Sequence, residues 1–278
     1  MSRPLTMPTC DDSSRRRWAA ETCVDLYGLK VGMRSNCTEI LDQMLLRLPT
    51  GWKQAESTQL DRVYSLWADG GGEDPVTLYQ EARRLLQNAP LEAALARLEF
   101  DVELFVVENN PARIFVHAGV VGWQRRAIVL PGRSYSGKST LVAALCRAGA
   151  TYYSDEYALF DADGRIHPYP RPLRLRAPRD GQLPVADELN LRVGDGPLPF
   201  GLIVLTHYQP AVFWQPRMVS PGEALLALLA NTMSARRRPQ FVLTALQGAL
   251  TSSRVVASPR GEAEETAEQL LQMAGGSA

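Results

Sequence analysis

The sequence predicts an α/β fold for the C-terminal part of the chain, preceded by a smaller N-terminal α/β or α+β portion. From residue 113 onwards, short and strongly apolar segments of strand length alternate with longer segments of helical periodicity. This alternation is typical of α/β proteins. The chain has 278 residues, of which 45% are hydrophobic and 22% charged. It is therefore long and apolar enough to bury a sizeable core without disulfides or structural metals.

The N-terminal portion is expected to span residues 21–110, after a disordered tail over residues 1–20 that is rich in Ser, Asp, Arg and Pro. Asn36 and Glu39 have the spacing of a helix N-cap and its capping-box partner, so a helix is expected to run from there to about Leu48. The apolar spacing also predicts a strand over residues 24–33 with a turn at Gly28, a strand over 62–68 and an amphipathic helix over 91–107.

The C-terminal portion is expected to span residues 111–278. Tyr152–Phe160 and Arg165–Tyr169 are expected to form a hairpin across the turn Asp161–Gly164, because glycine tolerates the positive φ that such turns require. Short apolar runs predict strands over residues 114–121, 127–130 and 202–205. Segments of helical pattern predict helices over 141–150, 221–233, 239–250 and 262–273.

Charge and hydropathy exclude several classes of partner. Thirty basic residues balance thirty acidic ones, so no overall field attracts nucleic acid or an acidic membrane surface. No segment approaches the roughly 18 consecutive apolar residues of a transmembrane helix, and no signal-peptide pattern is present. We therefore expect a cytoplasmic protein that binds neither nucleic acid nor membrane. The sequence leaves the oligomeric state open, a homo-oligomer included.

One motif carries recognisable chemistry. Gly132, Arg133, Ser134, Tyr135, Ser136, Gly137, Lys138 and Ser139 satisfy the pattern G-x-x-x-x-G-K-[ST] between a predicted strand and a predicted helix. In such a phosphate loop, the glycines let backbone N–H groups approach phosphate oxygens, and the helix N-terminus adds partial positive charge. Lys138 would reach the β- and γ-phosphates, and the Ser139 hydroxyl would ligate Mg²⁺. The alternative is a glycine turn that merely precedes a helix.

Transfer of a phosphoryl group also needs a carboxylate near the phosphates, and Asp155 and Glu156 follow the loop by about one helix. One acid could hold Mg²⁺ or take a proton from an attacking hydroxyl. Adjacent strand residues face opposite ways, so only one of the two is expected to point into a given site. The alternative is a solvated strand end. His117, within the apolar segment IFVHAGV, is by itself more typical of a buried core histidine than of a catalytic one.

Three segments in order, FVHAG, PGRSYSGKSTLVAAL and GATYYSDEYALFDADGRIHPYPRPLRLR, together resemble the C-terminal catalytic domain of HPr kinase/phosphorylase and its wider family. The resemblance covers about residues 112–275. It implies a P-loop kinase core related to that of phosphoenolpyruvate carboxykinase. It also implies an enzyme that uses ATP and Mg²⁺ to phosphorylate a serine-type hydroxyl.

Position by position, the resemblance assigns nucleotide binding to Gly132 through Thr140 and gives Asp155 the role of the base that activates the hydroxyl. Glu156, His117 and Lys138 would assist catalysis, and Ser139 and Asp155 would hold the metal. Glu156 stands where the family usually has a second Asp, and the family's later Glu-x-Arg-Gly signature is not found. The chain therefore looks more like the divergent branch that occurs with biosynthetic clusters, to which the lasso-peptide tailoring kinases belong.

The sequence thus predicts an ATP- and Mg²⁺-dependent kinase whose acceptor is a hydroxyl on a peptide, a protein or a small molecule. The N-terminal portion, which lacks any nucleotide-binding motif, would select that acceptor. The alternative is that its helix over residues 91–107 simply packs against the catalytic sheet. The alternative is an ATP-binding or ATPase module that transfers no phosphate to an acceptor and instead regulates a partner protein.

Overall fold

The computed structural model describes residues 18–69, 75–133, 136–171, 173, 191–251 and 253–276. The chain divides into two compact units, Met1–Ala112 and Arg113–Ala278. The boundary lies two residues beyond the one expected from the sequence. Most of the expected tail, residues 1–17, lies outside the described residues.

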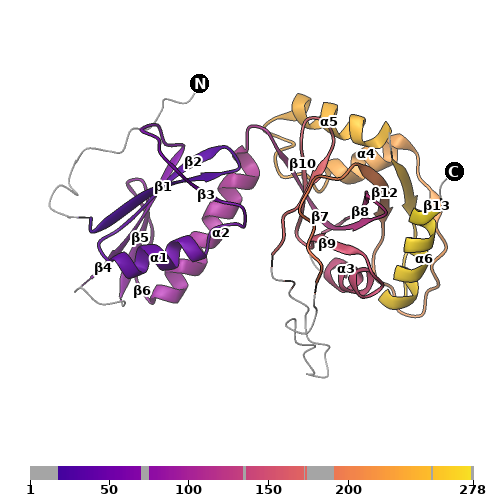
Figure 1. Ribbon diagram of the computed structural model, residues 1–278, viewed down its shortest axis with the longest axis horizontal. Coiled ribbons are helices and arrows are strands. Elements are labelled where there is room, and N and C mark those ends of the chain that lie inside the picture. The colour runs from indigo at the N-terminus through magenta and orange to yellow at the C-terminus, as the bar shows by residue number, and fades with distance from the viewer. Residues whose placement is uncertain are drawn as a thin grey trace. The chain divides into compact units, whose positions relative to one another are not determined.

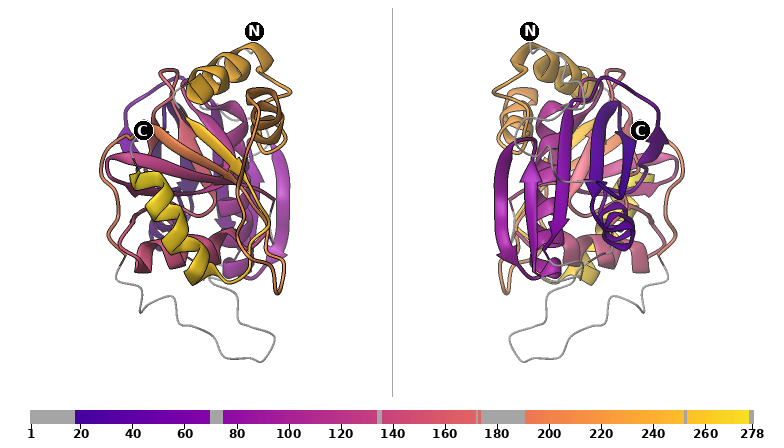
Figure 2. Two further views of the ribbon diagram at one scale, coloured as in Figure 1. Left: turned by 90° about the vertical axis from the view of Figure 1, so that its right-hand side faces the viewer. Right: turned by 90° about the vertical axis from the view of Figure 1, so that its left-hand side faces the viewer.

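The N-terminal unit is a six-stranded mixed sheet with its two helices on one face (Figure 1; Figure 2, right). The strand order is β3-β1-β2-β4-β5-β6, in which only the β2–β4 pair is parallel. The two helices contact each other as well as the sheet. The elements are β1 (Ala20–Leu26), β2 (Leu29–Ser35), α1 (Thr38–Leu46), β3 (Lys53–Ala55), β4 (Arg62–Ala68), β5 (Val76–Gln80), β6 (Arg83–Ala89) and α2 (Leu91–Asn109).

Several N-terminal elements match the sequence-based expectations. The turn between β1 and β2 is formed by Tyr27 and Gly28, both with positive φ, and β4 has the bounds that were expected. The capping prediction for α1 is wrong. The helix begins at Thr38 after Cys37, without a side-chain cap, and the Asn36 side chain instead pairs with the backbone of Ala68.

The C-terminal unit has three layers, with helices on both faces of an eight-stranded mixed sheet (Figure 1; Figure 2, left). The strand order is β11-β10-β7-β8-β12-β14-β13, and β9 also pairs with β7. The central strands β8, β12 and β14 are parallel. The elements are β7 (Ile114–Trp123), β8 (Arg126–Pro131), α3 (Lys138–Arg147), β9 (Thr151–Ser154), β10 (Tyr157–Phe160), β11 (Ile166–His167), β12 (Phe200–Leu205), β13 (Arg217–Met218), α4 (Pro221–Leu229), α5 (Pro239–Thr251), β14 (Arg254–Ala257) and α6 (Ala263–Gly275).

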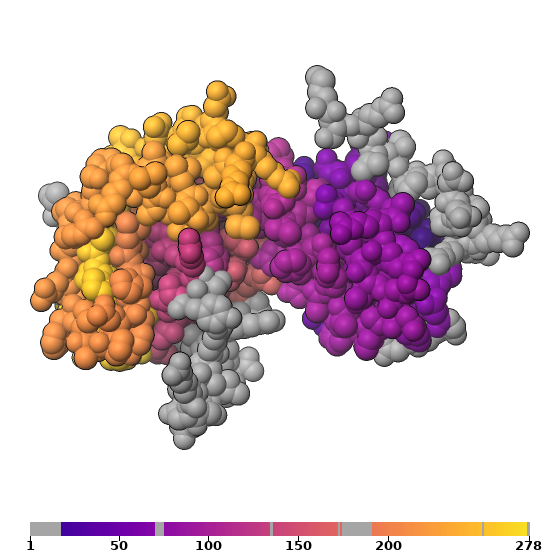
Figure 3. Space-filling model, turned by 180° about the vertical axis from the view of Figure 1, so that it is seen from behind, coloured from indigo at the N-terminus to yellow at the C-terminus, as the bar shows by residue number. Residues whose placement is uncertain are grey.

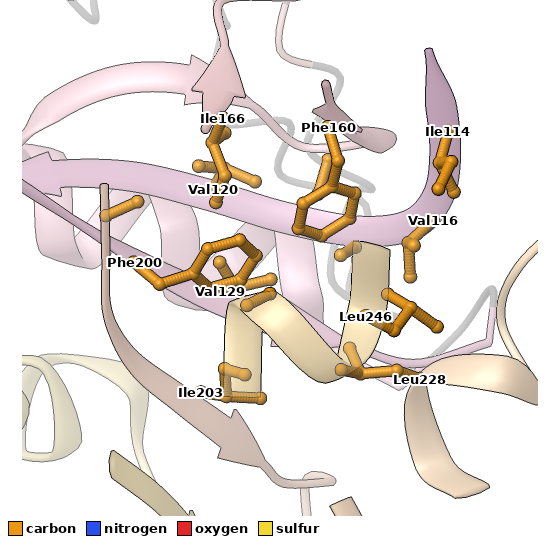
Figure 4. Packing of buried hydrophobic residues seen from close by; sticks show 14 of the residues in the cluster. Ile114, Val116, Val120, Val129, Phe160, Ile166, Phe200, Ile203, Leu228 and Leu246 are labelled. Atoms are coloured by element: carbon orange, nitrogen blue, oxygen red, sulfur yellow. The ribbon is translucent and has the colours of Figure 1, made fainter. Parts of the chain in front are cut away.

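Strand β8 lies between two apolar cores because successive strand residues point to opposite faces. Its residues Ala127 and Val129 pack with α4 and α5, and the residues between and after them, Ile128 and Leu130, pack with α3 and α6. Figure 4 shows the first of these cores, in which Leu228 and Leu246 are among the residues packed with the sheet. Burial on both faces explains why this strand is a continuous apolar run in the sequence.

Two C-terminal expectations need correction. The continuous strand expected over Tyr152–Phe160 is interrupted by a bend at Asp155 and Glu156, which separates β9 from β10. The expected hairpin across Asp161–Gly164 does form, between β10 and β11. Helix α4 ends at Leu229, four residues before the expected end at 233.

The segment that joins β12 to α4 forms a broad area of the surface of the C-terminal unit (orange in Figure 3). Phe213 and Met218 in this segment are exposed. No helix among the described residues is long and apolar enough to cross a membrane.

Candidate functional site

The glycine motif lies at the carboxyl end of β8, the first of the three central parallel strands. β8 ends at Pro131 and α3 begins at Lys138. Gly137 is the N-cap residue of α3 and has a φ of 84°, in the left-handed region that favours glycine. Its carbonyl accepts the Leu141 N–H at 3.2 Å. The loop thus leads directly into the N-terminus of a helix, which is the arrangement that binds phosphate in other proteins. Ser134 and Tyr135 lie outside the described residues.

Lys138 folds back onto the loop. Its Nζ donates hydrogen bonds to the carbonyl oxygens of Gly132, at 2.9 Å, and Arg133, at 2.8 Å. The residue is only 9% exposed, and this burial lowers the pKa of its ammonium group. Thr140, two residues further on, is exposed in the first turn of α3.

The loop and the first acid are joined by a direct hydrogen bond. The Ser139 hydroxyl donates to Oδ2 of Asp155 at 2.9 Å, and the Tyr152 hydroxyl donates to Oδ1 at 2.9 Å. Asp155 is 9% exposed. Burial raises the pKa of its carboxyl group, although both hydroxyl donors act in the opposite direction.

The second acid has a different partner. Oε1 of Glu156 lies 3.2 Å from Nε2 of His117, and this hydrogen bond is the main cause that lowers the pKa of Glu156. The glutamate side chain is 42% exposed, whereas that of His117 is largely buried. The bend between β9 and β10 therefore directs the two neighbouring acids to different partners. Both acids lie in this bend, so the expected alternation of side chains along a strand does not cause their separation.

The side chains of Ser139 and Asp155 have the donor chemistry that Mg²⁺ prefers. Both offer hard oxygen atoms, and they are already within hydrogen-bonding distance of each other. Among the described residues there is no group of three or more His, Cys, Asp or Glu side chains that could enclose a metal. Mg²⁺ is usually held by one or two carboxylates together with water and substrate phosphates, so Asp155 and Ser139 are the described residues that could hold it.

Two neighbours of the site were not recognised in the sequence. Tyr152 donates to Asp155, and Arg260, which follows β14, donates from Nη2 to the carbonyl of Gly137 at 2.8 Å. Tyr152 lies close to the acid pair in sequence and could have been suspected. Arg260 lies more than 120 residues beyond the loop, and no local pattern marks it.

A separate cavity of about 750 Å³ lies at the carboxyl end of β7, next to Gly122 and Trp123. It is lined in part by Trp123, Arg125, Arg165 and Arg192. None of the site residues expected from the sequence lines this cavity, so the candidate site is defined by the loop and the acids rather than by a large pocket.

The chain matches no model of a protein family, and no curated protein matches it significantly.

Proposed function

We propose that the C-terminal unit is an ATP- and Mg²⁺-dependent phosphotransferase with a P-loop core of the HPr kinase type, and that it phosphorylates a hydroxyl on a peptide, a protein or a small molecule. The observation that carries the proposal is the 2.9 Å hydrogen bond between the hydroxyl of Ser139 and the carboxylate of Asp155. A glycine turn that merely precedes a helix has no need of a buried carboxylate at this position. In P-loop nucleotide-binding proteins, a serine and an acid placed in this way hold the metal.

The loop would bind the polyphosphate of ATP through its backbone N–H groups and through Lys138. Phosphate oxygens would replace the carbonyls of Gly132 and Arg133 as acceptors for the lysine Nζ. Ser139 and Asp155 would hold Mg²⁺, which neutralises charge on the phosphates when it is bound. The buried carboxylate of Asp155 would then have a cation beside it.

Glu156 is better placed than Asp155 to accept the proton of the acceptor. Both oxygens of Asp155 already accept internal hydroxyl groups, and the residue is nearly buried. Glu156 is accessible, and His117 holds one of its oxygens. In the proposed step, the acceptor oxygen bonds to the γ-phosphorus and its proton passes to Glu156. The bond from the γ-phosphorus to the β–γ bridging oxygen breaks, and ADP leaves. The resemblance, in contrast, gives the base role to Asp155.

Substitution of Lys138 tests nucleotide binding. Lys138→Met keeps most of the buried aliphatic stem but removes the charge, and we expect MgATP affinity to fall at least about tenfold. Calorimetric titration of the full-length protein measures this change. Lys53→Ala, which removes an exposed lysine from β3, serves as the control. Equal affinity in the wild type and the Lys138→Met variant would overturn the phosphate-loop assignment.

Substitution of the two acids tests the transfer step. We expect Glu156→Gln to lower transfer from ATP to an array of serine peptides by about 10²–10⁴-fold while MgATP affinity is largely kept. Asp155→Asn should instead weaken binding of the Mg²⁺ complex. If Glu156→Gln keeps transfer within about tenfold of the wild type, the base is Asp155, as the resemblance implies. Release of ADP without any phosphorylated peptide would favour the regulatory ATPase alternative.

A further inference from the structure

Arg260 is a buried cation that touches the phosphate loop. It follows β14 and is 2% exposed. Its Nη2 donates to the carbonyl of Gly137 and its Nη1 to the carbonyl of Gly261, each at 2.8 Å. Its guanidinium carbon lies 5.5 Å from the centre of the Tyr208 ring. Backbone hydrogen bonds to residues 207 and 209, next to the end of β12, hold Arg260 in this position.

Among the residues that the structure describes, the charge of Arg260 has no close counter-ion. No carboxylate in the described part of the chain lies within ion-pair distance of it, and Glu262 and Glu264 act only from further away. Burial lowers the pKa of the guanidinium, but an arginine stays protonated at any physiological pH. A buried charge that has carbonyl acceptors but no counter-ion is costly, so the arrangement favours a binding partner that carries negative charge.

Other polar groups beside the loop are buried as well. Ser136 Oγ, Thr206 Oγ1 and Arg260 Nε are buried and have no hydrogen-bond partner among the described residues. These three residues lie around one void that is too small to admit a water molecule, together with Gly137 and Lys138. Such unpaired groups are few in folded proteins, and their gathering at one place points to a function rather than to stability.

Gly137 and Arg260 fit each other closely. A Cβ atom at residue 137 would lie 2.5 Å from Arg260 Nη2, and the φ of Gly137 is 84°. The carbonyl that Arg260 holds belongs to the peptide that joins Gly137 to Lys138, so the hydrogen bond fixes the orientation of the Lys138 N–H. That N–H belongs to the first turn of α3, where N–H groups have no acceptor within the helix.

We propose that Arg260 is a positioning residue that holds the Gly137–Lys138 peptide in the orientation that binds the β- and γ-phosphates of a nucleoside triphosphate, whose negative charge offsets the buried guanidinium. The inference rests on the proposed function, because it deepens the account of the same nucleotide site. It adds a cation, from the segment between β14 and α6, to the phosphate loop and Lys138.

The test compares Arg260→Gln and Arg260→Lys in the full chain. Glutamine can still donate to the Gly137 carbonyl but has no charge, whereas lysine keeps the charge and N–H donors on a single nitrogen. We expect Arg260→Gln to weaken binding of MgATP and of pyrophosphate at least about tenfold, the loss typical of one charge-assisted interaction. AMP should bind almost as before, and Arg260→Lys should recover most of the affinity. Arg147→Gln, which loses only the exposed ion pair with Glu264, is the matched control.

Each outcome decides between a positioning role and a structural one. Equal loss for AMP and ATP, or MgATP binding by Arg260→Gln within about twofold of the wild type, would overturn the inference while leaving the nucleotide site intact. If the wild type itself binds no nucleotide, both the inference and the proposed function fail. If Arg260→Gln does not fold, ¹⁵N NMR of the Arg260 Nε–H in the wild type decides. Its resonance, assigned with Arg260→Lys, should shift on saturation with MgATP but not with AMP, and an unchanged resonance would overturn the inference.

Discussion

Asp155 and Glu156 are adjacent in sequence, yet their surroundings push their pKa values in opposite directions. Burial raises the pKa of Asp155, and the hydrogen bond with His117 lowers that of Glu156. Pairs of acids whose environments separate their pKa values often divide the roles of a site between them. Here the division follows from the bend after β9, which turns Asp155 towards the phosphate loop and Glu156 towards β7.

At neutral pH we expect Asp155→Asn to stabilise the nucleotide-free protein. The pKa of Asp155 is higher in the folded protein than the value of about 3.9 in the unfolded chain. The carboxyl group therefore contributes fully to stability below the unfolded pKa. It loses this contribution as the pH rises through the pKa of the folded protein. Asparagine carries no charge to bury. Thermal unfolding should therefore show a Tm above that of the wild type at pH 7, with the difference shrinking as the pH falls towards the unfolded pKa.

The neighbouring variant Glu156→Gln should behave in the opposite way. Because the pKa of Glu156 is lowered on folding, its carboxylate stabilises the protein above the unfolded pKa of about 4.3, and this contribution is lost as the pH falls through the folded value. Glu156→Gln should thus be less stable than the wild type at pH 7 and approach it at low pH. Two variants with the same sign of pH dependence would contradict the different environments of the two acids.

At the scale of single elements, Asn36 shows how a tertiary contact overrides a local pattern. The spacing to Glu39 suggested a capping box, but the amide of Asn36 donates to the Ala68 carbonyl at 2.9 Å and accepts the Ala68 N–H at 2.8 Å. These contacts link the start of α1 to the end of β4. Both partners are backbone groups, so loss of the amide leaves a donor and an acceptor unpaired.

We expect Asn36→Asp to destabilise the protein at least as much as Asn36→Ala. Aspartate is as good an N-cap residue as asparagine, but it has no N–H to donate and its negative charge would face the Ala68 carbonyl. The loss should be about 1–3 kcal/mol in the free energy of urea unfolding, which is the cost of leaving buried backbone groups unsatisfied. A stability close to that of the wild type for Asn36→Asp would show that capping is the role of this residue after all.

Across the whole molecule, the sequence predicts best those features whose signal is local. β4 and β8 are short segments rich in apolar residues, and the glycine motif over residues 132–139 is contiguous in the sequence. β3 and β6 are edge strands with few apolar residues, and they form because β1 and β5 offer them a hydrogen-bonding edge. The pairing of Glu156 with His117 and the contact of Arg260 with the loop depend on which strands lie side by side, and no local pattern encodes that order.

The division of labour between the two units can be tested by truncation. All the residues assigned to nucleotide chemistry lie within the compact unit Arg113–Ala278, and each hydrogen bond described for them stays inside it. A chain that begins at Pro111 should therefore unfold cooperatively and bind MgATP within about threefold of the full-length affinity. It should fail to phosphorylate the acceptor if the N-terminal unit selects it. Lys138→Met in the truncated chain should abolish binding, as a control for specific association.

Aggregation or loss of MgATP binding in the truncated chain would show that the two units cannot be separated. Retained transfer would show that the acceptor is recognised by the C-terminal unit alone.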